Sequence, residues 1–281
     1  MGYCPHKLNA IAIQKQHQKQ PVGSAAMTLV TLTTDFGNND FYAPALKGAV
    51  LRVAPSVQLV DLTHHIRPYD IVQAAFVLEN AWREFPEGTI HCIGVNCVYG
   101  EGYRFVAARR SGHFFIAPDN GLLSLLFNDL SQADMRNVMP LNEHFAVKNV
   151  FAKSVAHLVS GAAFEELGEH PAPLMQRFSI QPVITKTRIR GTVIHIDHFD
   201  NAVVNIHRDV FEKQQNGRTF SLFFRRNDPL TRLSNDYCDV APGEPLCLFN
   251  SAGYLEISIN MGRASTLLNL KLDDVVEVLF G

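Results

Sequence analysis

The stretch Thr33-Thr34-Asp35-Phe36-Gly37-Asn38-Asn39-Asp40-Phe41-Tyr42 indicates how the chain begins to fold. A short apolar run, residues 29–32, precedes it, and a helical pattern starts near Tyr42. The sequence therefore predicts a strand that ends at the Asp35 carboxylate, then a turn and a helix. In open α/β sheets, ligands bind at the carboxyl ends of the strands. Asp35 and Asp40 suggest a site for hydroxyls or an amine, and no glycine-rich phosphate loop accompanies them.

Strand and helix patterns alternate from residue 28 to about residue 161. Helices are expected at 43–53, 71–85, 122–127 and 150–159, and strands at 29–33, 57–62, 89–95, 105–108 and 113–116. This order predicts an α/β domain with a mostly parallel sheet and helices on both faces.

The pattern changes after two proline-containing stretches, His170-Pro171-Ala172-Pro173 and Gln181-Pro182. Short β runs separated by turns follow, and they predict a smaller β-barrel or sandwich domain, of which we favour the barrel. The expected organisation is a disordered tail over residues 1–26, an N-terminal α/β domain over 27–170, a linker over 171–187 and a C-terminal β-barrel domain over 188–281.

Composition narrows the function classes. The chain has 281 residues and a formal net charge of −2, so its overall charge would not attract nucleic acid or an anionic membrane. No apolar run reaches the roughly 20 residues of a membrane span. The cysteines are odd in number and scattered, which is typical of reduced thiols in a cytoplasmic protein.

Polar side chains follow three of the expected strands. Asp35 and Asp40 follow the first, Asp61 and the pair His64-His65 end the second, and Asn96 ends the third. Their convergence would make a pocket, although each acid could instead cap a helix or a turn. The histidines match no common zinc spacing, so no metal is expected. Asp35-Phe36-Gly37 also occurs in kinases, but the other kinase motifs are absent.

Two loops of the second domain carry an aromatic ring or amides. They are Asp197-His198-Phe199-Asp200-Asn201 and a turn that starts at Asn250-Ser251 and leads to Asn260. An aromatic face and an amide edge suit a purine, but each loop alone is also an ordinary turn.

Taken in order, these motifs resemble one family, the S-adenosylmethionine (SAM) hydroxide adenosyltransferases, or SAM hydrolases, which are related to fluorinases and chlorinases. The matching stretches span about 230 residues and are Thr33-Thr34-Asp35-Phe36-Gly37, Val60-Asp61-Leu62-Thr63-His64, Phe85-Pro86-Glu87-Gly88-Thr89, Pro118-Asp119-Asn120-Gly121-Leu122, Ile196-Asp197-His198-Phe199 and Gly253-Tyr254-Leu255-Glu256-Ile257.

The resemblance implies a homotrimer whose SAM site lies between one subunit's N-terminal domain and its neighbour's C-terminal domain. SAM would be substrate, adenosine and methionine would be products, and no cofactor is implied. By motif, Asp35 would bind the ribose diol, Asp40 would approach the methionine ammonium and Tyr69 would flank the ribose. The remaining substrate-binding residues would be Phe145, Asp197, Phe199, Asn201, Ser251, Asn260 and Met261.

The chain departs from the family where the attacking water is handled. Hydrolases of the family carry an Asp, an Arg and a His in three short stretches. Here the Asp position is Asn96, the Arg position is Tyr103 and the His position is Ala146. The candidate catalytic residues are therefore Asn96, Tyr99, Arg104 and His144. Three functions stay open: a divergent SAM hydrolase, a halide adenosyltransferase, and a SAM- or nucleoside-binding protein without turnover.

Overall fold

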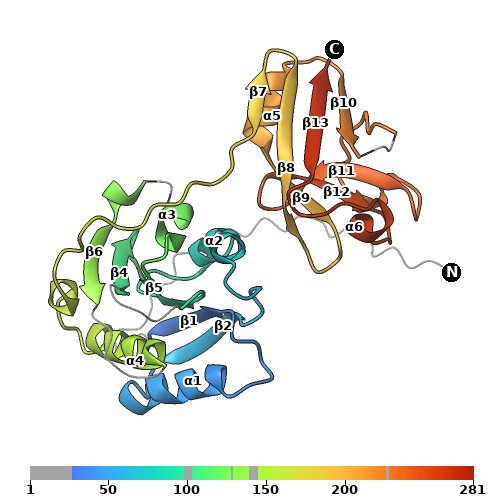
Figure 1. Cartoon of the computed structure of the whole chain (residues 1–281). Coiled ribbons are helices and arrows are strands. Elements are labelled where there is room, and N and C mark those ends of the chain that lie inside the picture. The colour runs from blue at the N-terminus through green and yellow to red at the C-terminus, as the bar shows by residue number, and fades with distance from the viewer. Residues whose placement is uncertain (1–26, 98–102, 128, 139–144, 226–227) are drawn as a thin grey trace, which may run out of the picture.

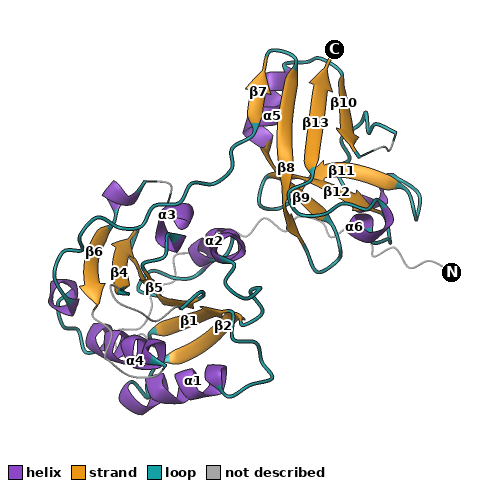
Figure 2. Ribbon diagram, viewed as in Figure 1, coloured by secondary structure: helices purple, strands orange, loops and turns teal. Residues whose placement is uncertain are grey.

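The structure is a computed structural model that describes residues 27–97, 103–127, 129–138, 145–225 and 228–281. Two sheets, each with its own core, lie in succession along the chain (Figure 1). The N-terminal sheet has helices on both sides, whereas the C-terminal part is mostly strand (Figure 2).

The N-terminal sheet has the strand order β2-β1-β3-β5-β4-β6. Its strands are β1 (Leu29–Thr34), β2 (Gln58–Thr63), β3 (Ile90–Gly94), β4 (Phe105–Arg110), β5 (His113–Pro118) and β6 (Asp134–Val138). The first strand ends next to Asp35, as predicted. The strands β2, β1, β3 and β5 pair in parallel, but β4 runs antiparallel to both β5 and β6.

The sheet is therefore mixed: three of its five strand pairings are parallel, and the two antiparallel ones lie at the edge formed by β5, β4 and β6. The reason is the two-residue turn Ser111-Gly112 between β4 and β5, where φ is 49° and 76°. Two positive φ values in succession make the kind of tight hairpin turn that joins antiparallel strands. A parallel connection would need a dozen or more residues.

Helices cover both faces of this sheet, as predicted. α1 (Tyr42–Val53) and α4 (Ala146–Val159) pack on one face, and α2 (Ile71–Glu79) and α3 (Leu122–Leu126) pack on the other. Fully buried side chains such as Leu46 of α1 and Leu78 of α2 fix the helices to the sheet. Each contributes about 1.5–3 kcal/mol of hydrophobic burial. Short 3₁₀ turns lie at Trp82–Glu84, Leu130–Gln132 and Phe164–Leu167.

The C-terminal sheet is a curled, seven-stranded antiparallel half-barrel. The order is β10-β13-β8-β9-β12-β11, with β7 added beside β8. Its elements are β7 (Val183–Thr185), β8 (Arg188–Ile196), β9 (Ala202–His207), α5 (Arg208–Gln215), β10 (Phe220–Phe224), a 3₁₀ turn (Tyr237–Asp239), β11 (Pro245–Phe249), β12 (Tyr254–Ile259), α6 (Ala264–Leu267) and β13 (Val275–Phe280).

The expected β-barrel is observed as a half-barrel. Among the described residues, the outer strands β10 and β11 are joined through residues 230–233, by the single bridges Leu222↔Leu230 and Leu233↔Cys247. Two isolated bridges provide no continuous ladder, so the sheet stays open along this seam.

The segment that joins the two sheets is held by its backbone. Arg104 donates to the carbonyls of Ala172 and Pro173 at 3.1 and 2.8 Å, and Asn205 Nδ2 donates to Ile180 O at 2.8 Å. The α2 helix also touches the half-barrel, because the Phe76 ring stacks on His195 with centroids 4.7 Å apart. None of the described helices is long and apolar enough to cross a membrane.

One buried polar chain links the three central parallel strands. His91 Nδ1 lies 2.8 Å from Thr31 Oγ1, and its Nε2 lies 3.2 Å from His113 Nδ1. Burial, together with His113, lowers the pKa of His91 to about 3. Both histidines are almost completely buried, so the folded chain keeps His91 neutral over the physiological range.

This burial predicts acid sensitivity. The unfolded state binds a proton at His91 below about pH 6.5, whereas the folded state does so only near pH 3, so the free energy of unfolding falls as pH drops through this window. The loss is at most about 1.4 kcal/mol per pH unit. Chemical denaturation between pH 7 and 4 should show a flatter slope for His91→Gln than for wild type. The control His198→Gln alters an exposed imidazole; equal slopes for all three proteins would contradict the prediction.

Candidate functional site

Three strand-end loops meet at the Asp35 carboxylate. Its Oδ2 accepts hydrogen bonds from the backbone N–H of Tyr69 at 2.9 Å and from that of Asn96 at 3.0 Å. Tyr69 follows β2 and Asn96 follows β3, so one oxygen joins the ends of three adjacent strands. No hydrogen bond from another described residue reaches Oδ1, which leaves it available to a hydroxyl.

The two donors lie in sharply turned loops. Tyr69 and Asn96 have φ of 68° and 52°, a left-handed conformation that asparagine tolerates better than most residues. Asn120 supports the second loop, because its Nδ2 donates to Val95 O at 3.0 Å while its Oδ1 accepts from Leu122 N at 3.1 Å. The Pro118–Leu122 motif thus positions the turn that carries Asn96.

An aromatic cluster lies beside Asp35. Phe145 begins α4 with φ of 57° and packs edge-on against Phe36, with centroids 5.7 Å apart, and against Tyr42 at 5.3 Å. Asp40 is exposed and caps only the next residue, accepting from Phe41 N at 2.8 Å. The structure therefore brings Asp35, Tyr69, Asn96 and Phe145 to one edge of the sheet, where Asp40 starts the α1 turn.

A second group of charged and polar side chains, from α1 and the end of β2, lies next to the Asp35 group. Lys47 Nζ lies 2.5 Å from Asp61 Oδ2, and His64 Nε2 lies 3.1 Å from Asp61 Oδ1. Burial acts to raise the pKa of Asp61, but Lys47 and His64 outweigh it and the pKa is lowered. Burial also lowers the pKa of His64, which keeps this imidazole neutral.

A separate cavity of about 510 Å³ lies on the half-barrel next to α2. It includes three predicted substrate-binding residues, Asp197, Phe199 and Ser251. Phe199 is exposed over 73% of its surface, so its ring face is open. The full lining is Phe76, Asn80, His195, Asp197, Phe199, Val203, Asn235, Asp236, Tyr237, Leu248, Phe249, Asn250, Ser251, Ala252 and Glu256.

Asn201 orients Asp197 from within the fold. Its backbone N–H and its Nδ2 both donate to the Asp197 carboxylate, at 2.8 and 3.1 Å. Because Asn201 is 5% exposed and does not line the cavity, its observed contact is with the neighbouring carboxylate.

The cavity also contains a buried carboxylate that sequence reasoning did not select. Glu256 is 3% exposed and accepts from Tyr237 Oη at 2.9 Å, Ser258 Oγ at 2.8 Å and Asn250 Nδ2 at 3.2 Å. Burial and the hydrogen bond to Glu256 raise the pKa of Tyr237. The sequence of β12 could have pointed to Glu256, because it is the one acid in a strand that is buried from Leu255 to Ile259.

Other predicted residues lie apart from this cavity. Asn260 is buried and donates to Val240 O at 2.8 Å, whereas Met261 is 88% exposed. Arg104 pairs with Asp119 at 2.7 Å besides holding the linker carbonyls. Tyr99 and His144 lie outside the described residues.

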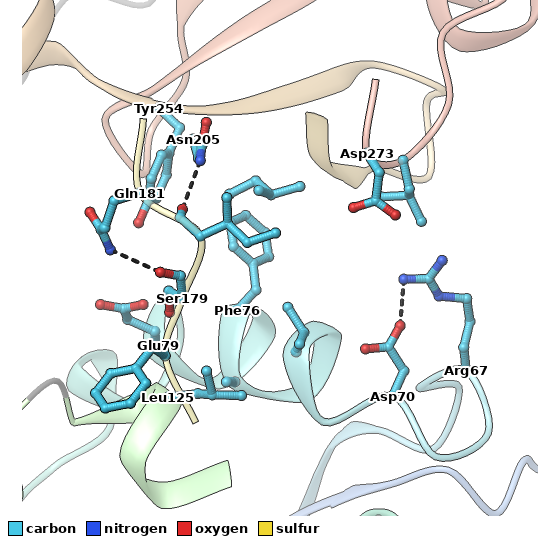
Figure 3. A pocket seen from close by; sticks show the side chains of 16 residues that line it. Arg67, Asp70, Phe76, Glu79, Leu125, Ser179, Gln181, Asn205, Tyr254 and Asp273 are labelled. Carbon is cyan, nitrogen blue, oxygen red and sulfur yellow. Dashed lines mark hydrogen bonds and ion pairs between the residues drawn. The ribbon is translucent and has the colours of Figure 1, made fainter. Parts of the chain in front are cut away.

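Within the described part of the chain, the residues around Asp35 lie apart from the half-barrel cavity. Asp35, Asp40 and Tyr69 are not among the residues that line the half-barrel cavity. Another cavity, of about 410 Å³, lies between α2, the linker and the half-barrel, and it contains none of the predicted site residues (Figure 3). Figure 3 shows Arg67 paired with Asp70 at one end and Glu79 near Ser179 and Gln181 at the other. Burial raises the pKa of Glu79.

Histidines and acids do not gather into a metal cluster in the described part of the chain, where no three such side chains could hold one ion. The side chains of the adjacent residues His64 and His65 have different surroundings. His64 is buried against Thr34, while His65 is exposed and contacts Asn38.

Comparison with known proteins identifies the family. The SAM hydroxide adenosyltransferase N-terminal domain matches residues 30–168, and the C-terminal domain of the same family matches residues 191–277. The chain belongs to the SAM hydroxide adenosyltransferase family. The resemblance inferred from the sequence motifs is thereby confirmed.

Similar proteins include both hydrolases and fluorinases. An (R)-S-adenosyl-L-methionine hydrolase of Thermus thermophilus is 30% identical, with 87% of this chain and 97% of that protein covered. A hydrolase of the same name from Methanocaldococcus jannaschii is 28% identical, covering 90% and 97%. A fluorinase of an Actinoplanes species is 27% identical, covering 89% and 97%.

A solved structure supports the whole fold. An uncharacterized conserved protein from Thermotoga maritima superposes with a TM-score of 0.80 at 27% identity, over 89% of this chain and 99% of that one. Both sheets of this adenosyltransferase family member are therefore shared with a known structure.

The shared oxygen of Asp35 predicts a stability effect. Asp35→Ala leaves two backbone N–H groups without their acceptor and should destabilise the fold by about 1–3 kcal/mol. Asp35→Asn, which keeps one oxygen, should cost less. The control Asp40→Ala removes only a local cap and should cost less than about 1 kcal/mol. Urea denaturation measures all three, and equal losses for Asp35→Ala and Asp40→Ala would refute this role.

Proposed function

We propose that this protein is a SAM hydrolase that converts SAM and water to adenosine and methionine. The observation that carries the proposal is the Asp35 carboxylate, held by two backbone N–H groups at the edge where three strands end. Its free oxygen suits a ribose diol, because a carboxylate accepts strong hydrogen bonds from hydroxyls. The hydrolases among the relatives support the choice of reaction.

The half-barrel would bind the rest of the substrate. The exposed Phe199 ring would stack on adenine, and the Asp197 carboxylate would help Asp40 of the other domain to hold the methionine ammonium. Ser251 would add a hydroxyl at the rim of the cavity. In this proposal Asn260 and Met261 shape the adenine pocket through their backbone.

A water oxygen would attack C5′ of the ribose in line while the C5′–sulfur bond breaks, and the proton that the water gives up would pass to solvent. The sulfonium makes methionine a good leaving group, so positioning and partial desolvation of water supply much of the rate enhancement. Asn96 replaces an acid, and its neutral amide can orient water but cannot remove a proton from it. We assign this orienting role to Asn96, with Tyr99 and His144 as further candidates. Arg104 would act indirectly, because its guanidinium is already bonded to Asp119 and the linker.

A halide adenosyltransferase is the second candidate, because fluorinases are also among the relatives. A protein that binds SAM without turnover is the third, because the Asp, Arg and His positions of the family are occupied here by Asn96, Tyr103 and Ala146.

Chromatography of reactions with SAM should separate these functions. We expect adenosine and methionine in equal amounts, independent of chloride or fluoride, and none from heat-inactivated protein. A halogenated deoxyadenosine that requires added halide would identify the second function. Tight SAM binding by calorimetry without product would identify the third.

We further propose a homotrimer in which each site combines Asp35 of one chain with Asp197 of its neighbour. Asp35→Asn and Asp197→Asn should each lose activity. Mixing and reassembling them in equal amounts should restore about a quarter of the wild-type sites, because one site in four then combines two intact halves. Each variant reassembled alone is the control, and a mixture as inactive as its components would place both acids in one chain.

A further inference from the structure

A chain of polar side chains, buried at Thr34 and His64 and reaching the surface at Asp61 and Lys47, adjoins the Asp35 turn. Thr34 Oγ1 lies 2.7 Å from His64 Nδ1, and His64 Nε2 lies 3.1 Å from Asp61 Oδ1, which is itself paired with Lys47. Thr34 is fully buried and His64 is 2% exposed. Thr34, Asp61 and His64 come from the ends of β1 and β2, the two strands that run side by side next to the site, and Lys47 comes from α1.

The order hydroxyl, imidazole, carboxylate is that of a nucleophilic triad, but the environment excludes that role. A nucleophile must reach the substrate, whereas the Thr34 side chain has no exposed surface. Its oxygen also accepts from the Phe36 N–H at 3.3 Å, so it is directed toward the backbone of the turn. The chain of contacts ends in the backbone that carries Asp35.

The contacts assign the protons. Nε2 of His64 faces a carboxylate and therefore carries the hydrogen, which leaves Nδ1 to accept the Thr34 hydroxyl hydrogen. The Thr34 oxygen then accepts from Phe36. The hydrogen bonds from Thr34 to His64 Nδ1 and from the Phe36 N–H to Thr34 each have one donor and one acceptor in this tautomer. The Nε2 of His64 lies close to the Asp61 carboxylate but is not aligned for a hydrogen bond.

Backbone bonds tie the same two turns together. Gly37 N donates to His64 O at 2.7 Å, and Ile66 N donates to Thr34 O at 3.3 Å. The neighbours of Asp35 on both sides, Thr34 and Gly37, are therefore bonded through their backbones to the turn that contains His64. A change in the His64 side chain would be felt on both sides of Asp35.

We propose that His64 is a positioning residue that sets the Asp35 carboxylate for a ribose diol, with Asp61 and Lys47 fixing its tautomer. The inference deepens the proposed function and rests on it for the identity of the ligand. Thr34 transmits the effect, and neither residue contacts the reacting atoms.

Hydrogen exchange of the ligand-free full-length protein tests the positioning itself. His64→Leu and Thr34→Val should each raise the exchange rate of residues 35–42 by about tenfold or more, because an opening cost of 1.4 kcal/mol corresponds to a factor of ten. Thr34→Ser keeps the hydroxyl and should behave as wild type. His65→Leu is the matched control, since that neighbouring imidazole is exposed and contacts only Asn38 among the described side chains.

Ligand measurements test the consequence. His64→Leu and Thr34→Val should weaken adenosine binding by about tenfold and raise the KM for SAM more than they lower kcat. Unchanged exchange in residues 35–42, or exchange that rises equally throughout the N-terminal domain, would overturn the positioning role. Wild-type protein that binds neither SAM nor adenosine would defeat the proposed function, while the exchange data would still decide the role of His64.

Discussion

The candidate site depends on one carboxylate oxygen that accepts two backbone N–H groups. Asp35 Oδ2 joins the loops after β2 and β3 to the end of β1. Parallel strands have no hairpins that hold their ends together, so a shared acceptor supplies a connection that the sheet itself lacks. Both donors lie at residues with positive φ, which shows that the loops adopt an unfavourable conformation in order to reach it.

Local patterns predicted the elements that bury apolar side chains at a regular spacing. The strand before Asp35, the helix from Tyr42 and the helices on both faces of the sheet follow from such patterns and are confirmed. β6 was missed because Asp134, Arg136 and Asn137 give it a polar texture, and the partner that makes it a strand is β4. The open seam of the half-barrel likewise depends on pairing between distant segments, which no local window contains.

The sequence predicts a site residue only where the chemical type of the residue already indicates what it would contact. Asp35 was predicted to follow a strand and to bind ligand; its place at the end of β1 is confirmed, and its binding role stays a prediction. The bonds of Arg104 to the linker and of His64 to Thr34 join residues 30 or more positions apart, so no spacing rule reveals them. Glu256 was not selected from the sequence. Its carboxylate is buried because three side chains donate hydrogen bonds to it, and these contacts are visible only in the structure.

The hydrogen bonds that hold the linker to the two domains are made by its main chain, while Leu174 packs on the core of the first sheet. Arg104 and Asn205 bind its carbonyls, while Asp119 and Ser124 accept from the N–H groups of Met175 and Arg177. The side chains that make these bonds all belong to the two domains. The linker's own side chains are thus largely free of the task of joining the domains, and we expect its sequence to drift among relatives while its length and path persist.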